Sequence, residues 1–277
     1  MSSTTILYKH FLHHPIVCTD TRKIFSGCIF FALKGESFNG NQFATHALNS
    51  GAAYVVIDEK IIDDRTEKIF FVENVLSTLQ QLATHHRNQL NVPIIALTGS
   101  NGKTTTKELI YRVLKQHYNV LATQGNLNNH IGVPLTLLSL NKSHQVAVIE
   151  MGANHQKEIE LLCEIAQPNQ GLITNIGKAH LEGFGGVEGV KKGKGELYDY
   201  LRKRDGTIFI NNDSDQLKEI LNGYDKVVSY GTGGDVKYCG HSVNNDSMLK
   251  VQITKQFHIE IKTQLEKAVI DYTNQFL

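Results

Sequence analysis

The chain has 277 residues, enough for about two domains of ordinary size, and 41% hydrophobic with 20% charged residues is typical of a folded protein. The formal net charge is +1 and no block of like charges occurs, so the sequence gives no support for binding of nucleic acid or of a membrane surface. No apolar run is long enough for membrane insertion and the first residues lack a signal-peptide pattern, which predicts a cytoplasmic protein.

Residues 1–90 are predicted to form a small mixed α/β domain. A helix is expected over 41–51 and ends at Gly51, because glycine is suited to the left-handed position after a helix. A second helix is expected over 75–90, where apolar residues recur at helical spacing, and Pro93 marks the expected domain boundary. Strands are expected over 27–35, 52–58 and 68–74.

From residue 91 onwards, apolar strands alternate with helices. This alternation indicates a mostly parallel sheet covered on both faces, and hence an α/β fold with a second domain at 91–265. After Gly234 the pattern changes to antiparallel strands with a turn at 244–246, and a short helix is expected over 266–277. The parallel strands are expected over 93–99, 119–123, 145–152, 170–177, 207–213 and 226–231.

The stretch ALTGSNGKTTTKELI, residues 96–110, places a glycine-rich loop between a buried strand and a helix. Glycines let backbone N–H groups converge on an anion, and the helix N-terminus adds partial positive charge. Lys103 would reach the terminal phosphates of a nucleotide, and the Thr104 hydroxyl is placed to bind Mg²⁺. The first glycine of the motif G-x-x-x-x-G-K-[ST] falls at Leu97, so a glycine-rich turn without a ligand is the alternative. The candidate nucleotide-binding residues are Gly99, Ser100, Asn101, Gly102, Lys103, Thr104 and Thr105.

Other candidate residues follow later strands. Glu150 ends the apolar run VAVIE, and an acid at the carboxyl end of a parallel strand lies on the edge where ligands bind, which makes it a candidate for binding Mg²⁺. A surface or helix-capping glutamate is the alternative. His180 follows another expected strand, and Lys191, Lys192 and Lys194 begin a helix. Periodicity does not distinguish these four from an ordinary histidine and a solvated basic helix.

The motifs taken together resemble the Mur ligases, the ATP-dependent amide-forming enzymes of peptidoglycan synthesis. The resemblance covers about residues 16–265 in register, and six ordered motifs are far more specific than a single phosphate loop. Near the N-terminus the matching stretch is TDTRKIFSGCIFFALKG. The later ones are TGSNGKTTT, GNLNNHIGVPLTLL, VIEMGANH, TNIGKAHLEGFG, KGKGELYDYL and INNDSD.

The resemblance implies a role for each candidate residue. Lys103 and Thr104 would bind the phosphates of ATP and a first Mg²⁺, Glu150 would complete that metal site, and His180 would hold a second Mg²⁺. Lys194 falls where the family carries a carbamylated lysine, with Lys192 as the alternative. Carbamylation requires a neutral amine, so a pKa lowered by burial or nearby cations is expected.

Of these residues, the resemblance gives Lys103, His180 and Lys194 catalytic roles, and Thr104, Glu150, His180 and Lys194 the role of metal ligands. The resemblance further implies that Asn211 and Asp213 contact the nucleoside of ATP. Thr21, Arg22, Asn39 and Gly40 would lie on the side of a UDP-sugar, and Asn128 and Asn129 would face the acceptor carboxylate.

The implied reaction joins UDP-N-acetylmuramoyl-tripeptide to D-alanyl-D-alanine through an acyl phosphate made with ATP, catalysed by a monomer. The third domain of the family normally follows residue 265, and the short tail 266–277 stands in its place, so that domain is expected to be missing. Two alternatives stay open: a non-catalytic module that binds UDP-muropeptide or ATP, and a related ligase that adds another amino acid.

Overall fold

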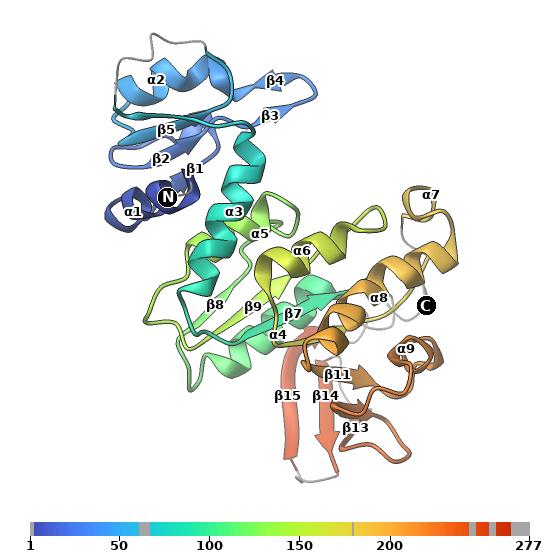
Figure 1. Cartoon of the computed structure of the whole chain (residues 1–277). Coiled ribbons are helices and arrows are strands. Elements are labelled where there is room, and N and C mark those ends of the chain that lie inside the picture. The colour runs from blue at the N-terminus through green and yellow to red at the C-terminus, as the bar shows by residue number, and fades with distance from the viewer. Residues whose placement is uncertain (1–2, 61–66, 179, 244–247, 255–258, 267–277) are drawn as a thin grey trace. The chain divides into compact units, whose positions relative to one another are not determined.

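The computed structural model describes residues 3–60, 67–178, 180–243, 248–254 and 259–266. The predicted turn at 244–246 and all but the first residue of the predicted terminal helix lie outside these ranges. Two compact units can be distinguished (Figure 1). Unit 1 contains Met1–Asn91, Gln124–Ser143 and Glu164–Gln167, and unit 2 contains Val92–Thr123, His144–Cys163 and Pro168–Leu277.

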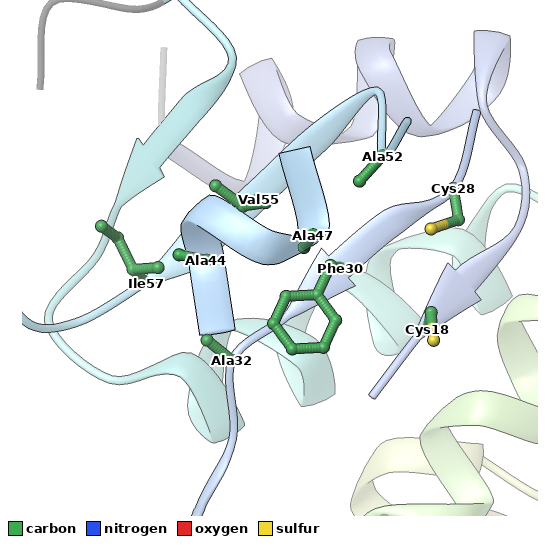
Figure 2. Packing of buried hydrophobic residues seen from close by; sticks show 9 residues of the cluster. All are labelled: Cys18, Cys28, Phe30, Ala32, Ala44, Ala47, Ala52, Val55 and Ile57. Atoms are coloured by element: carbon green, nitrogen blue, oxygen red, sulfur yellow. The ribbon is translucent and has the colours of Figure 1, made fainter. Parts of the chain in front are cut away.

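Unit 1 is built on a parallel sheet, which in the described residues has the strand order β1-β2-β5-β6. Helix α2 (Ala44–Asn49) packs on this sheet through Ala44 and Ala47, whose small side chains bring the helix close to Phe30 and Val55 (Figure 2). Gly51 follows this helix with φ +92°, as predicted for a left-handed position. The strands are β1 (Val17–Cys18), β2 (Ile29–Phe31), β5 (Tyr54–Ile57) and β6 (Ile69–Phe71).

Helix α1 (Ser3–His13) has no counterpart among the predicted elements. Its segment contains Thr4, Thr5 and Ile6, and β-branched residues have low intrinsic helix propensity. Tertiary packing decides the outcome here, because Phe11 is fully buried and its ring lies 5.0 Å from that of His86 on helix α3 (Val75–Asn88). The remaining elements of unit 1 are η1 (Thr21–Lys23), β3 (Lys34–Gly35), β4 (Phe38–Asn39), η2 (Gly40–Phe43) and α5 (Gly132–Leu138).

Unit 2 is built on a second sheet, and its described strands follow the order β15-β14-β13-β12-β11-β10-β7-β9-β8. All pairs from β8 to β13 are parallel, which confirms the predicted parallel sheet, and β13, β14 and β15 pair antiparallel (Figure 1). The first strand after Gly234, β13, still pairs parallel to β12, so the predicted antiparallel pairing begins between β13 and β14. The strands are β7 (Ile94–Thr98), β8 (Val120–Ala122), β9 (Val146–Glu150), β10 (Gln170–Ile173), β11 (Thr207–Asn211), β12 (Val227–Gly231), β13 (Tyr238–Val243), β14 (Met248–Ile253) and β15 (Ile259–Glu266).

Helices cover both faces of the parallel part of this sheet. Helix α4 (Lys103–Leu114) packs through Ile110 and Leu114 on one face. Helix α8 (Val187–Lys203) covers the other face, where a Cβ at Gly171 of β10 would lie 3.0 Å from the Leu201 side chain. Coverage on both faces explains why every residue of β9 is buried. The other helices are α6 (Glu158–Ala166), which passes from unit 2 into unit 1, α7 (Leu181–Phe184) and α9 (Asp215–Leu221).

Candidate functional site

The predicted nucleotide-binding residues of unit 2 lie along one edge of its sheet. Strands β9, β7, β10 and β11 are neighbours and run parallel, so their carboxyl ends meet at the same edge. Glu150 ends β9, the glycine-rich loop follows β7, and Asn211 ends β11. Ligands of open α/β sheets bind outside these carboxyl ends, which makes this edge the candidate site.

The loop of residues 99–102 requires glycine at both of its ends. Gly99 has φ +148°, and a Cβ there would lie 1.9 Å from the Thr174 hydroxyl. Gly102 has φ +74° and directly precedes the first residue of helix α4. The left-handed conformation turns the chain sharply into the helix, so the free N–H groups of the first helical turn face the edge of the sheet.

The segment after β10 holds the loop in place. The Asn175 side chain accepts a hydrogen bond from Asn101 N–H at 3.0 Å and donates one to the Asn101 carbonyl at 3.1 Å. Thr174 Oγ1 donates to the same carbonyl at 2.6 Å, and Ser100 N–H donates to the Asn175 carbonyl at 3.1 Å. Because Ser100 and Asn101 have their N–H groups engaged, the N–H groups of residues 102–105 are the ones left to bind an anion.

These bracing residues were not among the predicted site residues. Thr174, Asn175 and Gly177 belong to the stretch TNIGKAH at the carboxyl end of an expected strand, but residue type and spacing alone do not show which loop this strand end contacts. Gly177 N–H donates to Ser100 Oγ at 2.9 Å, and this oxygen in turn donates to the Gly177 carbonyl at 3.2 Å.

Lys103 lies folded back over the loop. Its Nζ donates to the carbonyls of Gly99 at 2.8 Å and of Ser100 at 3.3 Å. Burial lowers the pKa of this amine, and the negative charge of Glu150 partly opposes that shift. A cation held by neutral carbonyls among converging N–H groups is a strong attractor for an anion.

Thr104 and Glu150 form a pair of oxygen donors beside the loop. Thr104 Oγ1 donates to Glu150 Oε1 at 3.3 Å, and Glu150 is 1% exposed. A hydroxyl and a carboxylate are the kind of hard oxygen ligands that Mg²⁺ prefers, so the pair fits this ion. Among the described residues, no three His, Cys, Asp or Glu side chains are grouped so that they could hold a metal on their own.

Lys194 is a deeply buried lysine of helix α8. It is 1% exposed, its Nζ donates to the Ala153 carbonyl at 3.2 Å, and the amine lies 5.0 Å from the centre of the Phe184 ring. Burial, together with the positive charge of Lys103, lowers the pKa of Lys194 to about 8. Lys192, the alternative position, is exposed, and Lys191 forms an ion pair with Glu219. The environment that favours a neutral amine therefore belongs to Lys194.

His180 lies at the start of helix α7, with an exposed side chain and φ +55°. Its carbonyl accepts a hydrogen bond from Phe184 N–H at 3.2 Å. Its imidazole takes part in no hydrogen bond that joins it to Thr104, Glu150 or Lys194 among the described residues. Its metal-binding role stays a prediction.

Asn211 and Asp213 border a cavity of about 320 Å³. Its lining also includes Tyr230, Gly231 and Tyr238. Asn211 Oδ1 accepts from Asp213 N–H at 3.0 Å, and Asp213 Oδ2 accepts from Thr232 N–H at 2.8 Å. The two side chains therefore shape the wall of the cavity through bonds to the backbone.

The predicted substrate residues all lie in unit 1, and several of their polar groups are engaged within it. Asn39 Oδ1 accepts from Asn41 N–H at 3.0 Å, and Asn39 Nδ2 donates to Glu59 at 2.8 Å. A Cβ at Gly40 would lie 2.5 Å from the Leu33 carbonyl, so close packing alone accounts for this glycine.

The other four predicted substrate residues of unit 1 form two pairs of neighbours, which differ in the side-chain groups that remain available to a ligand. Asn129 follows Asn128 directly in the chain, and its Oδ1 accepts hydrogen bonds from the N–H groups of Ile131 at 3.1 Å and of Gly132 at 2.9 Å. Thr21 and Arg22 lie in the short helix η1, and the Arg22 side chain is 86% exposed although it is paired with Asp20. Arg22 is therefore open to an anionic ligand.

Fold and loop together define a phosphate-loop protein of the α/β class. Residues 97–266 match the family model described as the Mur ligase middle domain, and residues 13–90 match that of the Mur ligase family, catalytic domain. The chain belongs to the Mur ligase family.

Within this family, the chain is similar to ligases that share one name and to their crystal structures. The chain is 43% identical over 224 residues to the UDP-N-acetylmuramoyl-tripeptide–D-alanyl-D-alanine ligase of Synechocystis sp., covering 79% of this chain and 49% of that protein. It is similar to the crystal structure of MurF from Acinetobacter baumannii, with TM-score 0.80 and 34% identity over 90% of this chain and 55% of the other. The structure of MurF ligase from Thermotoga maritima in complex with ADP gives TM-score 0.81 and 29% identity, over 91% and 58% of the two chains.

The chain spans about half the length of the curated relatives that it matches. Within the described part of the chain, none of the helices combines the length and the apolar character that crossing a bilayer requires.

Proposed function

We propose that this chain provides the ATP and UDP-substrate sites of a ligase that adds D-alanyl-D-alanine to UDP-N-acetylmuramoyl-tripeptide. The observation that carries the proposal is the phosphate loop, with Lys103 over it and the Thr104–Glu150 pair beside it. The names of the similar proteins support the proposed substrates, and the ADP bound in the related Thermotoga maritima structure supports the proposal that this chain binds a nucleotide.

In this proposal the nucleotide lies along the carboxyl edge of the unit 2 sheet. The N–H groups of residues 102–105 and the Lys103 amine bind the phosphates, because all of them donate hydrogen bonds to anionic oxygens. The cavity beside Asn211 and Asp213 has aromatic rings in its lining, which suits the flat base of the nucleotide. Phosphate binding and base binding are thus assigned to neighbouring parts of one edge.

The proposed reaction takes place in two transfers. A carboxylate oxygen of the tripeptide attacks the γ-phosphorus of ATP, the bond to the β-phosphate oxygen breaks, and ADP leaves. The free amine of D-alanyl-D-alanine then attacks the carbonyl carbon of the acyl phosphate, loses a proton, and expels phosphate to leave an amide. Positioning and charge neutralisation are the main contributions of the protein to such a transfer.

The Thr104 and Glu150 oxygens would hold Mg²⁺, which supplies positive charge against the phosphate oxygens. Lys194 is the candidate for carbamylation, in which its neutral amine forms an N–C bond to dissolved CO₂ and releases a proton. Its burial and its lowered pKa support this assignment, because they raise the neutral fraction at neutral pH. The product would be a negatively charged ligand, and His180 is proposed for the second Mg²⁺.

Residues 1–90 are proposed as the domain that binds the UDP-muropeptide, with the exposed Arg22 available to its phosphates. Asn128 and Asn129 are proposed for the acceptor side. A reaction that uses ATP and a UDP-linked substrate implies a cytoplasmic location. We also propose that the protein is a monomer.

The test is phosphate release by the purified chain with Mg-ATP and UDP-N-acetylmuramoyl-tripeptide, with and without D-alanyl-D-alanine. Release that depends on the dipeptide, with formation of a UDP-linked pentapeptide, supports the ligase. Nucleotide or UDP-muropeptide binding without release would favour a non-catalytic binding module instead.

Lys103→Ala tests the nucleotide site directly. Removal of a half-buried, charged phosphate contact is expected to weaken ATP binding about 100-fold. Lys115→Ala is the matched control, because Lys115 lies just after the same helix and is exposed. Equal ATP affinity in the wild type and Lys103→Ala would refute the assignment of this loop.

A further inference from the structure

Lys107 is a buried lysine of helix α4. It is 1% exposed, its Nζ donates to the Thr123 carbonyl at 2.7 Å, and it lies 2.9 Å from Glu108 Oε1 at the surface. A buried ammonium loses its hydration, and an apolar side chain of the same length would avoid that cost. The position of its amine therefore calls for a reason other than packing.

The contact with Thr123 changes the pairing of strands β8 and β9. Thr123 N–H donates to the Val148 carbonyl at 3.0 Å, as in a regular parallel ladder. The next bond of that ladder would run from Glu150 N–H to the Thr123 carbonyl. Instead, Lys107 occupies this carbonyl, and Glu150 N–H donates to Thr123 Oγ1 at 2.9 Å.

These bonds close a ring around Glu150. Its backbone N–H is held by Thr123, Thr123 is held by Lys107, and its carboxylate is held by Thr104. Thr104 and Lys107 are three positions apart on helix α4, so they lie on neighbouring positions of one helical face. The ring thus ties the end of β9 to the helix that begins at the phosphate loop.

We propose that Lys107 and Thr123 are positioning residues, which fix the Glu150 carboxylate beside Thr104 and so determine how strongly a divalent cation supports nucleotide binding. Without the amine, the Thr123 carbonyl is free to accept Glu150 N–H in the regular ladder. The end of β9 then shifts, and the carboxylate moves relative to the Thr104 hydroxyl. This inference rests on the proposed nucleotide function.

The experiment compares ADP affinity in EDTA with ADP affinity in excess Mg²⁺, by titration calorimetry on the full chain. The measured quantity is the factor by which Mg²⁺ tightens binding. Lys107→Met and Thr123→Val are expected to reduce this factor about tenfold, since each removes a hydrogen bond of the ring that fixes the Glu150 backbone, and with it the position of the carboxylate. Affinity in EDTA is expected to change by about twofold at most, because neither residue contacts the phosphates.

Two matched controls accompany these variants. Thr123→Ser keeps the hydroxyl, and Lys115→Met removes an exposed lysine next to the same helix. Both are expected to keep the Mg²⁺ factor within about twofold of the wild type. The thermal unfolding midpoint is recorded for every variant, and the Thr123→Val and Thr123→Ser pair decides the result if Lys107→Met does not fold.

Unchanged Mg²⁺ factors in folded Lys107→Met and Thr123→Val would overturn the positioning role. If Lys103→Ala still weakens ADP binding about 100-fold in that case, the proposed nucleotide site stands and only the inference fails. Absence of ADP binding by the wild type would overturn both.

Discussion

In unit 1, acidic and basic side chains lie beside each other, whereas in unit 2 the half-buried Lys103 of the phosphate loop and the buried Lys194 of helix α8 repel one another. Lys34 contacts Asp58 at 3.0 Å and Glu59 at 2.9 Å, and these contacts raise the pKa of the lysine. The carboxylates respond in the matching direction: bonds from Lys34 and from neighbouring amides lower the pKa of Glu59, and they outweigh burial at Asp58 to lower its pKa also. The folded state thus favours the charged form of every member of this group.

In unit 2 the folded state instead disfavours the charged form of Lys103 and of Lys194. Burial lowers the pKa of both Lys103 and Lys194, and the charge of Lys103 lowers that of Lys194 further. The fold keeps these cations at a cost in stability, while the charges of unit 1 contribute to stability. Strained electrostatics of this kind cluster at functional sites, because a ligand or a modification completes the missing interaction.

The largest expected effect is the pH dependence of stability that arises from Lys194. Its folded-state pKa of about 8 lies below its ordinary value of 10.5, so the folded chain binds fewer protons than the unfolded chain between these values. Stability of the wild type relative to Lys194→Met should therefore rise from pH 8 to 10.5, by about 3 kcal/mol.

Chemical denaturation across this pH range, in CO₂-free buffer, measures the difference. A difference that does not change with pH would show that the fold does not disfavour the charged lysine. Added bicarbonate should reduce the pH dependence if the amine is carbamylated, because the carbamate no longer titrates as an amine.

Removal of one amide side chain from each unit is expected to have a smaller effect. Asn175 braces the phosphate loop, and Asn41 links Asn39 to Asp58. Asn175→Ala and Asn41→Ala should each lower the free energy of unfolding by about 2 kcal/mol, since both lose hydrogen bonds within the fold.

Only Asn175→Ala should also weaken ADP binding, by about tenfold, because the loop then has to be ordered by the ligand. Urea denaturation and calorimetric titration on the same samples give both quantities. Equal ADP affinity in the two variants would mean that the bracing of the loop serves the fold alone.

The smallest effect is expected for Lys34, whose side chain is 41% exposed. Lys34→Met removes the partner that lowers the pKa of Glu59 and of Asp58, so the wild type should be modestly more stable at neutral pH. This advantage should vanish as the pH falls through the folded-state pKa values of the carboxylates, because protonated acids no longer pair with the amine. Acid denaturation of both proteins tests it, and an advantage that persists in acid would contradict the ion-pair explanation.

Features of the fold that depend on neighbouring residues could be predicted from the amino-acid sequence. Alternating apolar strands and helices predicted the parallel sheet, because strands buried on both faces must be apolar throughout. The loop and the start of α4 were predicted because Gly102 and Lys103 act through local backbone geometry and charge. The position of Glu150 at the end of β9 followed from the same local pattern.

Which polar groups remain available for chemistry depends on tertiary contacts, and could not be predicted from the sequence. Asn39 and Asn129 have residue types suited to substrate binding, yet their side-chain oxygens accept backbone bonds within unit 1. Lys192 and Lys194 are alike in sequence, but only Lys194 is buried. Asn175 and Lys107 meet their partners across 74 and 16 positions, and such contacts follow from strand order and helix packing, which residue type and spacing do not encode.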